Sequence, residues 1–393
     1  MFTGYTSDLI DDLKNRWARL QAGVRQAGAD GMLVGTNVNL FYLSGRVFMG
    51  FAYIPAEGAP WFFVRRPCGL AGPNVVELRK PEQIPEILRG GGVAVPGKVL
   101  LESDDLTHSE WVRLAAVFGP AQVADGSALL RRCRSVKTPY EVRVMKKTGS
   151  RHAAVFARFA TVYEPGMTDQ AWAVELYGLM LRAGALGLFR IAGASLEAFM
   201  GTVLAGDNGG AASPYDFGLG GAGMHPSLPV GQTGVVMKEG MSVMVDIAGN
   251  FYGYLTDCSR TFSIGKLSPK AYDAHQVSID IQRAIAAAGV PGARCEDLYE
   301  IALKKAAGAG LSDFFMGLTQ KAKFVGHGTG LVINEQPVLC ARSKETLEAG
   351  MCIALEPKFV IPGTGAVGVE DTFLVTADGM ENITPCDSAI LTL

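Results

Sequence analysis

The chain of 393 residues is 48% hydrophobic and 19% charged, with a formal net charge of -2 at pH 7. This length can build the cores of two domains. The balanced charge argues against nucleic acid and acidic membranes as partners, and no apolar run reaches the roughly 20 residues that a membrane span requires.

The chain alternates at first between helical and strand patterns. Residues 8–28 carry apolar residues at helical spacing and end at an Asp-Gly break. Apolar strand-like runs follow, among them GMLVGT, AYIPAEGAPWFFVRR and GKVLLES, with helical stretches between them. This alternation predicts an α/β domain. The charged segment 131–140 ends in Thr-Pro, which is typical of a boundary, so we divide the chain into domains 1–134 and 135–393.

The second domain combines helices with strands. Helical patterns cover about 140–163, 169–183, 267–289 and 295–310. Between and after them lie strand and loop segments that contain several isolated acidic residues. The expected class is α+β, in which antiparallel strands carry a site and helices cover the back.

A glycine-rich stretch contains GLGGAG, which matches the dinucleotide fingerprint at Gly218, Gly220 and Gly223. No apolar strand leads into it, and Met-His-Pro follows where a helix should begin. We therefore expect no nucleotide cofactor, and interpret the stretch as a loop that shapes the mouth of an active site.

The cysteines and the first residues of the chain bear on the cellular compartment in which the protein works. The seven cysteines are widely spread and form no CxxC pair, so neither a disulfide framework nor a zinc knuckle is expected. The stretch MFTGYTSDLIDDLKNRW carries acids and no apolar core, unlike a signal peptide. We expect a cytoplasmic protein with reduced cysteines.

Four acids are embedded in apolar runs: Asp246 in VMVDIAG, Asp257 in YLTDCSRTF, Glu356 in IALEPKF and Glu370 in VGVEDTFLV. His327 lies among glycines in FVGHGTG. An unpaired buried charge costs several kcal/mol. Four such acids together therefore indicate a cation.

The spacing of these acids predicts two hairpins. Glu356 and Glu370 are equidistant from Gly363, which lies in a turn-forming Pro-Gly-Thr-Gly stretch. A hairpin folded there places the two carboxylates opposite each other, with side-chain roots about 5 Å apart. Asp246 and Asp257 flank GNFYG in nearly the same way. Like charges in these positions repel unless divalent cations bind between them, and five ligands suit two metal ions better than one.

The order of these motifs resembles that of the pita-bread metallopeptidases: Asp-x10-Asp, then GHGxG, then acids in ALEP and VEDT. That family includes methionine aminopeptidase, aminopeptidase P, prolidase and the metal-free creatinase. The segment RWARLQAGVRQAGADGMLVGTNVNLFYLSG is similar to the opening of the creatinase/prolidase N-terminal domain. The resemblance implies a C-terminal pita-bread fold, an antiparallel sheet backed by helices, with an N-terminal α/β domain of the creatinase/prolidase type.

The resemblance also implies roles for the five residues. Asp246 would bind one divalent ion, His327 and Glu356 the other, and Asp257 and Glu370 would bridge the two. A bridging hydroxide would be the nucleophile, and Glu356 would shuttle protons. The family's metals are Mn, Co, Fe or Zn, and the sequence does not select one. Members with two domains are commonly homodimers, so a homodimer is expected.

Three departures from the family pattern concern the substrate pocket. Val230 stands in LPVG where prolidases have His, Asn334 stands in NEQP at a second His position, and Gly368 stands where they tend to have Arg. Asn334 can still donate a hydrogen bond to a carbonyl, whereas Val230 cannot. His225, five residues before Val230, is a candidate replacement if the loop bends, although a lone His in a glycine-rich loop is more often incidental.

These motifs leave three hypotheses for function. The first is a dinuclear metal-dependent hydrolase, an Xaa-Pro aminopeptidase or dipeptidase acting on a small peptide. The second is a pita-bread metalloenzyme acting on a non-peptide small molecule, as a C–N hydrolase or a lyase. The third is a non-catalytic binding module. The complete set of five ligands favours the first two.

Overall fold

The computed structural model describes residues 2–66, 69–190, 200–215 and 217–393. These residues form two compact units, one of Met1–Arg134 with Thr138–Tyr140 and one of Ser135–Lys137 with Glu141–Leu393. The boundary that we predicted after residue 134 falls in the segment where the chain passes between the units. Each unit is described by itself below.

The N-terminal unit is built on one six-stranded sheet with the order β4-β3-β2-β1-β5-β6. Strands β1 and β2 are antiparallel, whereas β1, β5 and β6 are parallel. The strands are β1 Gly31–Val34, β2 Gly50–Pro55, β3 Trp61–Val64, β4 Val75–Glu77, β5 Lys98–Leu101 and β6 Gln122–Asp125. The helices are α1 Ser7–Gln26, α2 Asn37–Ser44, η1 Pro81–Gln83, α3 Ile84–Gly90, α4 His108–Val117 and α5 Ser127–Ser135. The predicted α/β class of this unit is confirmed.

Helix α1 shows why the first predicted helix forms. The Thr6 hydroxyl caps its start by accepting the Leu9 N–H, which satisfies a backbone donor left open at the first turn. Leu13, Leu20 and Val24 lie on one face of the helix and are fully buried. The helix covers nearly the range that its apolar spacing predicted.

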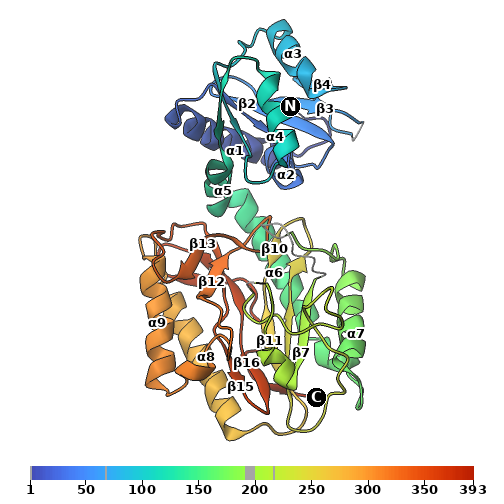
Figure 1. Ribbon diagram of the computed structural model, residues 1–393, viewed down its shortest axis with the longest axis vertical. Helices are drawn as coiled ribbons and strands as arrows, with labels where there is room; N and C mark the ends of the chain where they lie inside the picture. The colour runs from blue at the N-terminus through green and yellow to red at the C-terminus, as the bar shows by residue number, and fades with distance from the viewer. Residues whose placement is uncertain (1, 67–68, 191–199, 216) are drawn as a thin grey trace. The chain divides into compact units, whose positions relative to one another are not determined.

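The C-terminal unit contains two larger sheets, each backed by a pair of helices (Figure 1), and two two-stranded sheets, β9–β10 and β15–β16. The first sheet has the order β19-β11-β8-β7 and packs on α6 and α7 through Phe156, Trp172 and Val245 among others. The second has the order β13-β12-β14-β17-β18 and packs on α8 and α9 through residues such as Ile281 and Ile353. This arrangement confirms the predicted antiparallel sheets with helices behind them.

The elements of this unit have the following bounds. The helices are α6 Pro139–Phe156, η2 Phe159–Val162, α7 Asp169–Arg182, η3 Gly206–Gly210, α8 Pro269–Ala288, α9 Cys295–Gly308 and η4 Ser312–Phe314. The strands before α8 are β7 Gly201–Ala205, β8 Ser242–Ile247, β9 Gly249–Asn250, β10 Leu255–Thr256 and β11 Ser259–Ser263. The later strands are β12 Phe324–Gly328, β13 Glu335–Cys340, β14 Cys352–Leu355, β15 Lys358–Ile361, β16 Gly365–Gly368, β17 Asp371–Val375, β18 Met380–Asn382 and β19 Leu391–Thr392.

The hairpin predicted around Gly363 is confirmed. Strands β15 and β16 pair antiparallel with Lys358 opposite Gly368, and β14 and β17 continue the same register with Leu355 opposite Asp371. This register sets Glu356 opposite Glu370. Gly363 has φ +73°, a left-handed conformation that glycine adopts without steric cost.

The centre of the turn predicted between Asp246 and Asp257 lies one residue closer to the C-terminus than expected. In the antiparallel pair of β8 and β11, Asp246 lies opposite Ser259, so Asp257 is a diagonal neighbour of Asp246. The reason is that β9 and β10 pair Asn250 with Leu255, which shifts the centre of the turn toward the C-terminus. The two carboxylates still belong to the same face, because the displacement along the strand is two residues.

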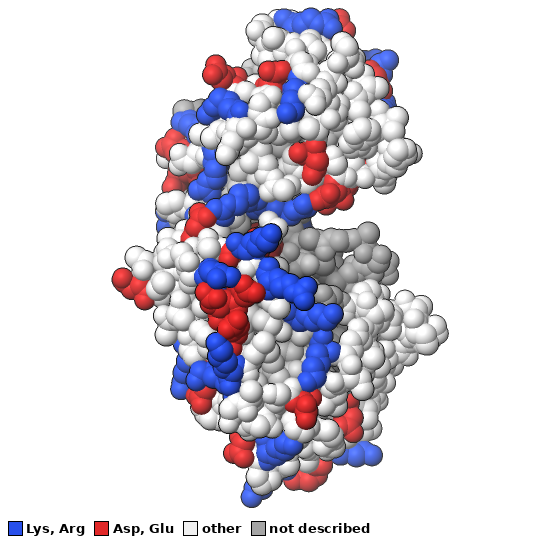
Figure 2. Space-filling model, turned by 60° about the vertical axis from the view of Figure 1, so that its left-hand side comes forward, with Lys and Arg blue, Asp and Glu red and all other residues white. Residues whose placement is uncertain are grey.

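The charges on the surface are mixed (Figure 2), and the described cysteines are not paired in disulfides. Figure 2 shows Lys and Arg interspersed with Asp and Glu over the face that it presents. No helix among the described residues is both long and apolar enough to cross a bilayer. The six cysteines outside the undescribed stretches are free thiols, and Cys68 lies outside the described residues.

Candidate metal centre

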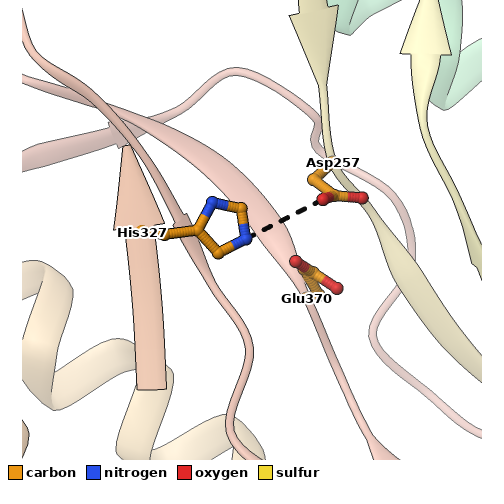
Figure 3. A group of neighbouring side chains, drawn as sticks. All are labelled: Asp257, His327 and Glu370. Atoms are coloured by element: carbon orange, nitrogen blue, oxygen red, sulfur yellow. Dashed lines mark ion pairs between the residues drawn. The ribbon is translucent and has the colours of Figure 1, made fainter. Parts of the chain in front are cut away.

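The two sheets of the C-terminal unit bring the five predicted ligands together. Asp246 lies in β8 and Asp257 follows β10, whereas His327 lies in β12, Glu356 follows β14 and Glu370 precedes β17. Their ligand atoms form two sets, each within 4.8 Å: one is Asp257, His327 and Glu370, and the other is Asp246, Glu356 and Glu370. Figure 3 shows the side chains of the first set converging on one space.

The first set is organised around His327. Its Nδ1 lies 3.0 Å from the carbonyl oxygen of Gly328, a bond in which Nδ1 donates. This bond directs Nε2 toward the acids, at 4.0 Å from Asp257 Oδ2 and 3.4 Å from Glu356 Oε1. A histidine whose second ring nitrogen is held by a carbonyl is typical of a metal ligand.

Burial perturbs the pKa of each group in this set. Burial, with the neighbouring charge of Asp246, raises the pKa of Asp257 to about 7. Burial together with the charges of Asp257 and Glu356 raises the pKa of Glu370 well above its usual value. Burial would lower the pKa of His327, but its hydrogen bond to Glu356 and the nearby carboxylates raise it to about 9. The set therefore attracts positive charge.

The second set surrounds a lysine that the sequence analysis did not include. The Nζ of Lys358 lies 2.8 Å from Asp246 Oδ2, 2.8 Å from Glu356 Oε2 and 2.9 Å from Glu370 Oε2. Its side chain is fully buried. Burial alone would lower the pKa of Lys358, but these three carboxylates raise it well above its usual value, so the group is an ammonium ion.

The signal for Lys358 was present in the sequence. Side chains two residues apart on a strand share a face, so a lysine two positions after Glu356 must point where Glu356 points. A lysine inside the apolar run KFVI is also the same kind of anomaly as the embedded acids. The prediction considered only residue types that bind metals and therefore passed over a cation.

The two sets differ in their fit to a divalent ion. Asp257, His327 and Glu370 offer two carboxylates and an imidazole, a donor set that suits Mn, Co, Fe or Zn. Asp246, Glu356 and Glu370 already share a cation at hydrogen-bond distance. A metal ion there would need the same oxygens at about 2.0–2.2 Å. The second set therefore already surrounds a positive charge at the place where a second ion was predicted.

Neighbouring side chains hold the ligands in place. The Ser259 hydroxyl donates to Glu370 Oε2 at 2.5 Å. Arg260, fully buried, donates through Nη1 to the main-chain carbonyl of Glu370 and through Nη2 to Asp371 Oδ1, each at 2.7 Å. Thr372 exchanges two hydrogen bonds with the main chain of Asp257. The carboxylates are therefore positioned by the fold itself.

A cavity of about 100 Å³ opens onto the site. All five predicted ligands line it. The apolar part of its lining comprises Phe189, Met200, Phe217, Leu219, Ala248, Phe324 and Ile333. Asn334 also lines the cavity and is exposed, which places its carboxamide at the rim. Phe217, Gly218 and Leu219 come from the glycine-rich loop, as expected of a loop that shapes the mouth of the site.

The other sequence candidates lie elsewhere. His225 is exposed, and its Nδ1 lies 2.8 Å from the Ser227 hydroxyl, so its side chain does not join the five ligands. Val230 is likewise outside the residues that line the cavity. Gly368 has φ +146°, and a Cβ there would lie 2.6 Å from the carbonyl oxygen of Pro357. The backbone at residue 368 therefore leaves no room for a side chain.

Comparison with known families identifies both parts of the chain. The pattern described as "Metallopeptidase family M24" matches residues 143–377, and that described as "Creatinase/Prolidase N-terminal domain" matches residues 16–136. Both agree with the resemblance drawn from the motifs.

Individual relatives are similar over most of the chain. An uncharacterised peptidase of Bacillus subtilis is 25% identical over 387 residues, covering 94% of this chain and 97% of its own. An Xaa-Pro dipeptidase of Lactobacillus helveticus is 28% identical, covering 73% of this chain and 70% of its own. The solved structure of an Xaa-Pro dipeptidase from Bacillus anthracis has a TM-score of 0.79 at 22% identity, covering 97% of this chain and all of that one. At that identity the structural match shows the fold.

Proposed function

Because this chain belongs to metallopeptidase family M24, we propose that it is a metal-dependent hydrolase of short peptides, an Xaa-Pro dipeptidase or aminopeptidase. The observation that carries the proposal is the buried set of Asp257, His327 and Glu370 at the base of an apolar cavity. The name of one relative, the Xaa-Pro dipeptidase of Lactobacillus helveticus, supports the substrate class.

The residues of the site have distinct tasks in this reaction. Asp257, His327 and Glu370 would hold a divalent ion, which when bound polarises a carbonyl group and lowers the pKa of water. The apolar walls, among them Phe217 and Ile333, fit a small side chain or a proline ring and exclude bulk water. Asn334 at the rim can donate a hydrogen bond from its carboxamide to the substrate carbonyl.

Glu356 is the candidate for proton transfer. Its Oε1 lies 3.4 Å from His327 Nε2, and its Oε2 accepts from Lys358 at 2.8 Å. A carboxylate beside the reacting water can carry a proton to the leaving amine. In this chain the lysine holds that carboxylate in one orientation, so we keep proton transfer by Glu356 as a prediction that Glu356→Gln tests.

The decisive experiment is an assay of Xaa-Pro dipeptides and longer peptides with Mn²⁺, Co²⁺, Fe²⁺ or Zn²⁺ added to chelator-treated protein. We expect turnover that requires metal and that falls to background in Asp257→Asn. Turnover without metal, or full activity in Asp257→Asn, contradicts the assignment. The same assay shows which of these metals, manganese among them, supports turnover.

A second candidate is hydrolysis of a non-peptide C–N bond. The observation that favours it is the crowded backbone at Gly368, which leaves no room for the arginine that would anchor a terminal carboxylate in the prolidase-like pattern. Metal-dependent turnover of small amides, with none of any peptide in the panel, would support this candidate over the first.

Assembly and location complete the proposal. We propose a cytoplasmic homodimer, on the resemblance to the two-domain members of the family. Light scattering of the purified protein tests the dimer, since a monomer at micromolar concentration contradicts it.

A further inference from the structure

We propose that the ammonium group of Lys358 takes the place of one of the two metal ions expected at this site, so that the protein binds a single divalent ion. This inference rests on the proposed metal binding and concerns the number of ions, whichever substrate is hydrolysed. It assigns to Lys358 a positioning role: one positive charge, built into the chain, holds three carboxylates together.

The geometry around Nζ supports this assignment. Its three carboxylate neighbours, Asp246, Glu356 and Glu370, are the same three residues whose oxygens form the second candidate metal set. Distances of 2.8–2.9 Å are those of charge-assisted hydrogen bonds. An ammonium ion has three N–H donors, so three carboxylate oxygens satisfy it completely.

Burial shows that the ammonium group of Lys358 depends on its carboxylate partners. The Lys358 side chain is fully buried, and a charge in that position is stable only when it is paired. Two glycines close the space around it. A Cβ at Gly218 would lie 2.0 Å from Glu356 Oε2 and 3.3 Å from Lys358 Nζ, and a Cβ at Gly368 would lie 3.0 Å from Lys358 Cα. The lysine is therefore enclosed beside its carboxylates.

The carboxylates of Glu356 and Glu370 show how Lys358 and one metal ion can occupy the site together. Glu356 directs Oε2 to Lys358 and Oε1 toward His327, at 2.8 Å and 3.4 Å. Glu370 belongs to both candidate sets, with Oε2 committed to Lys358. Both glutamates thus lie between the ammonium and the first set, as carboxylates lie between two metals in a dinuclear site. The first set keeps Asp257, which makes no ion pair with Lys358 among the described residues.

The test is a count of ions per chain. Chelator-treated full-length protein is loaded with Mn²⁺, and bound ions are counted by calorimetric titration and by elemental analysis after desalting. We expect one ion per chain in the wild type and two in Lys358→Ala, in which the oxygens and the space of the second set become available. Lys358→Met is the matched control, because an uncharged side chain of similar length still fills the space; it should bind one ion.

A second pair of variants keeps the test decisive if Lys358→Ala does not fold. Asp246→Asn should still bind one ion, because Asp246 pairs with the lysine, whereas Asp257→Asn should bind none. The electron paramagnetic resonance spectrum of Mn²⁺ bound to the wild type should be that of an isolated ion, without coupling to a second one. Two ions in the wild type, none in the wild type, or one in a folded Lys358→Ala overturn the proposal.

These outcomes separate this inference from the proposed function. One bound ion with no turnover of any peptide leaves the role of Lys358 intact and removes the peptidase assignment. Two bound ions with peptide turnover do the reverse.

Discussion

Thr372 and the main chain of Asp257 are joined by two hydrogen bonds: the Thr372 hydroxyl donates to the Asp257 carbonyl at 3.0 Å and accepts from the Asp257 N–H at 2.7 Å. Thr372 lies in β17 of the second sheet, whereas Asp257 lies between β10 and β11 next to the first. One hydroxyl therefore links the two halves of the C-terminal unit at a candidate metal ligand. The link fixes the position of the Asp257 carboxylate through its backbone.

Replacing this hydroxyl should weaken metal binding without removing a ligand. In Thr372→Val the buried N–H and carbonyl of Asp257 lose their partner, which costs about 1–3 kcal/mol of stability. We expect metal affinity to fall about 10–100-fold, as for other residues that orient a ligand. Thermal unfolding and Mn²⁺ titration measure the two effects.

A matched control comes from Thr148, which is also fully buried but whose hydroxyl has no hydrogen-bond partner among the described residues. Thr148→Val should leave stability unchanged or raise it, and should not alter metal affinity. Equal losses in both variants would show that Thr372 contributes only general packing.

Arg260 and Asp371 form a fully buried ion pair behind Glu370, with Nη2 2.7 Å from Oδ1. Removing one partner leaves the other charge unpaired, so Arg260→Met should lower the free energy of unfolding by about 3–5 kcal/mol. Urea unfolding of metal-free protein measures this. The exposed pair of Lys146 and Glu381 is the control, since Lys146→Met should cost at most about 1 kcal/mol. A comparable loss from both substitutions would contradict the argument.

Gly218 packs against the carboxylate of Glu356, where a Cβ would lie 2.0 Å from Oε2. Gly218→Ala must displace Glu356 or the loop, so we expect at least about 10-fold weaker metal binding. Gly308→Ala provides a contrast, because no heavy atom lies within 4 Å of a Cβ at that end of α9. That substitution should leave metal binding intact and raise stability by up to about 1 kcal/mol. Wild-type affinity in Gly218→Ala would show that the loop yields without moving Glu356.

His152 should make stability depend on pH. It is fully buried on α6, with Nδ1 3.0 Å from the Thr256 hydroxyl, and burial, with the charge of Arg260, lowers its pKa from 6.5 to about 3. Because the folded protein then takes up the proton less readily than the unfolded chain, stability is lost as pH falls from about 6.5 toward 3. The slope contributed is about 1.4 kcal/mol per pH unit.

The comparison of wild type with His152→Gln over pH 4–8 isolates this effect. The difference in unfolding free energy between the two proteins should be constant above pH 7 and should change in favour of the variant at lower pH. The exposed His225 is the control, since His225→Gln should reproduce the wild-type profile. Parallel profiles for wild type and His152→Gln would contradict the prediction.

The sequence by itself determined which elements form and which acids meet. Apolar spacing predicted the helices, because this signal depends on residues within one or two turns. The symmetric spacing of Glu356 and Glu370 about Gly363 predicted their pairing, because a tight hairpin determines its own register. The turn between Asp246 and Asp257 was predicted less accurately, because its centre lies one residue closer to the C-terminus than expected. The strand pairs β9–β10 and β8–β11 share the register that sets this turn.

Only the tertiary structure decided how the site is charged. The ammonium of Lys358 meets Asp246 from a different sheet, 112 positions away in the chain, and Gly218 encloses it from a distant loop. Which charges share a buried space depends on how the two sheets pack, and local sequence does not encode that packing. The same packing leaves His225 in solvent, although its distance along the chain from Val230 made it a candidate.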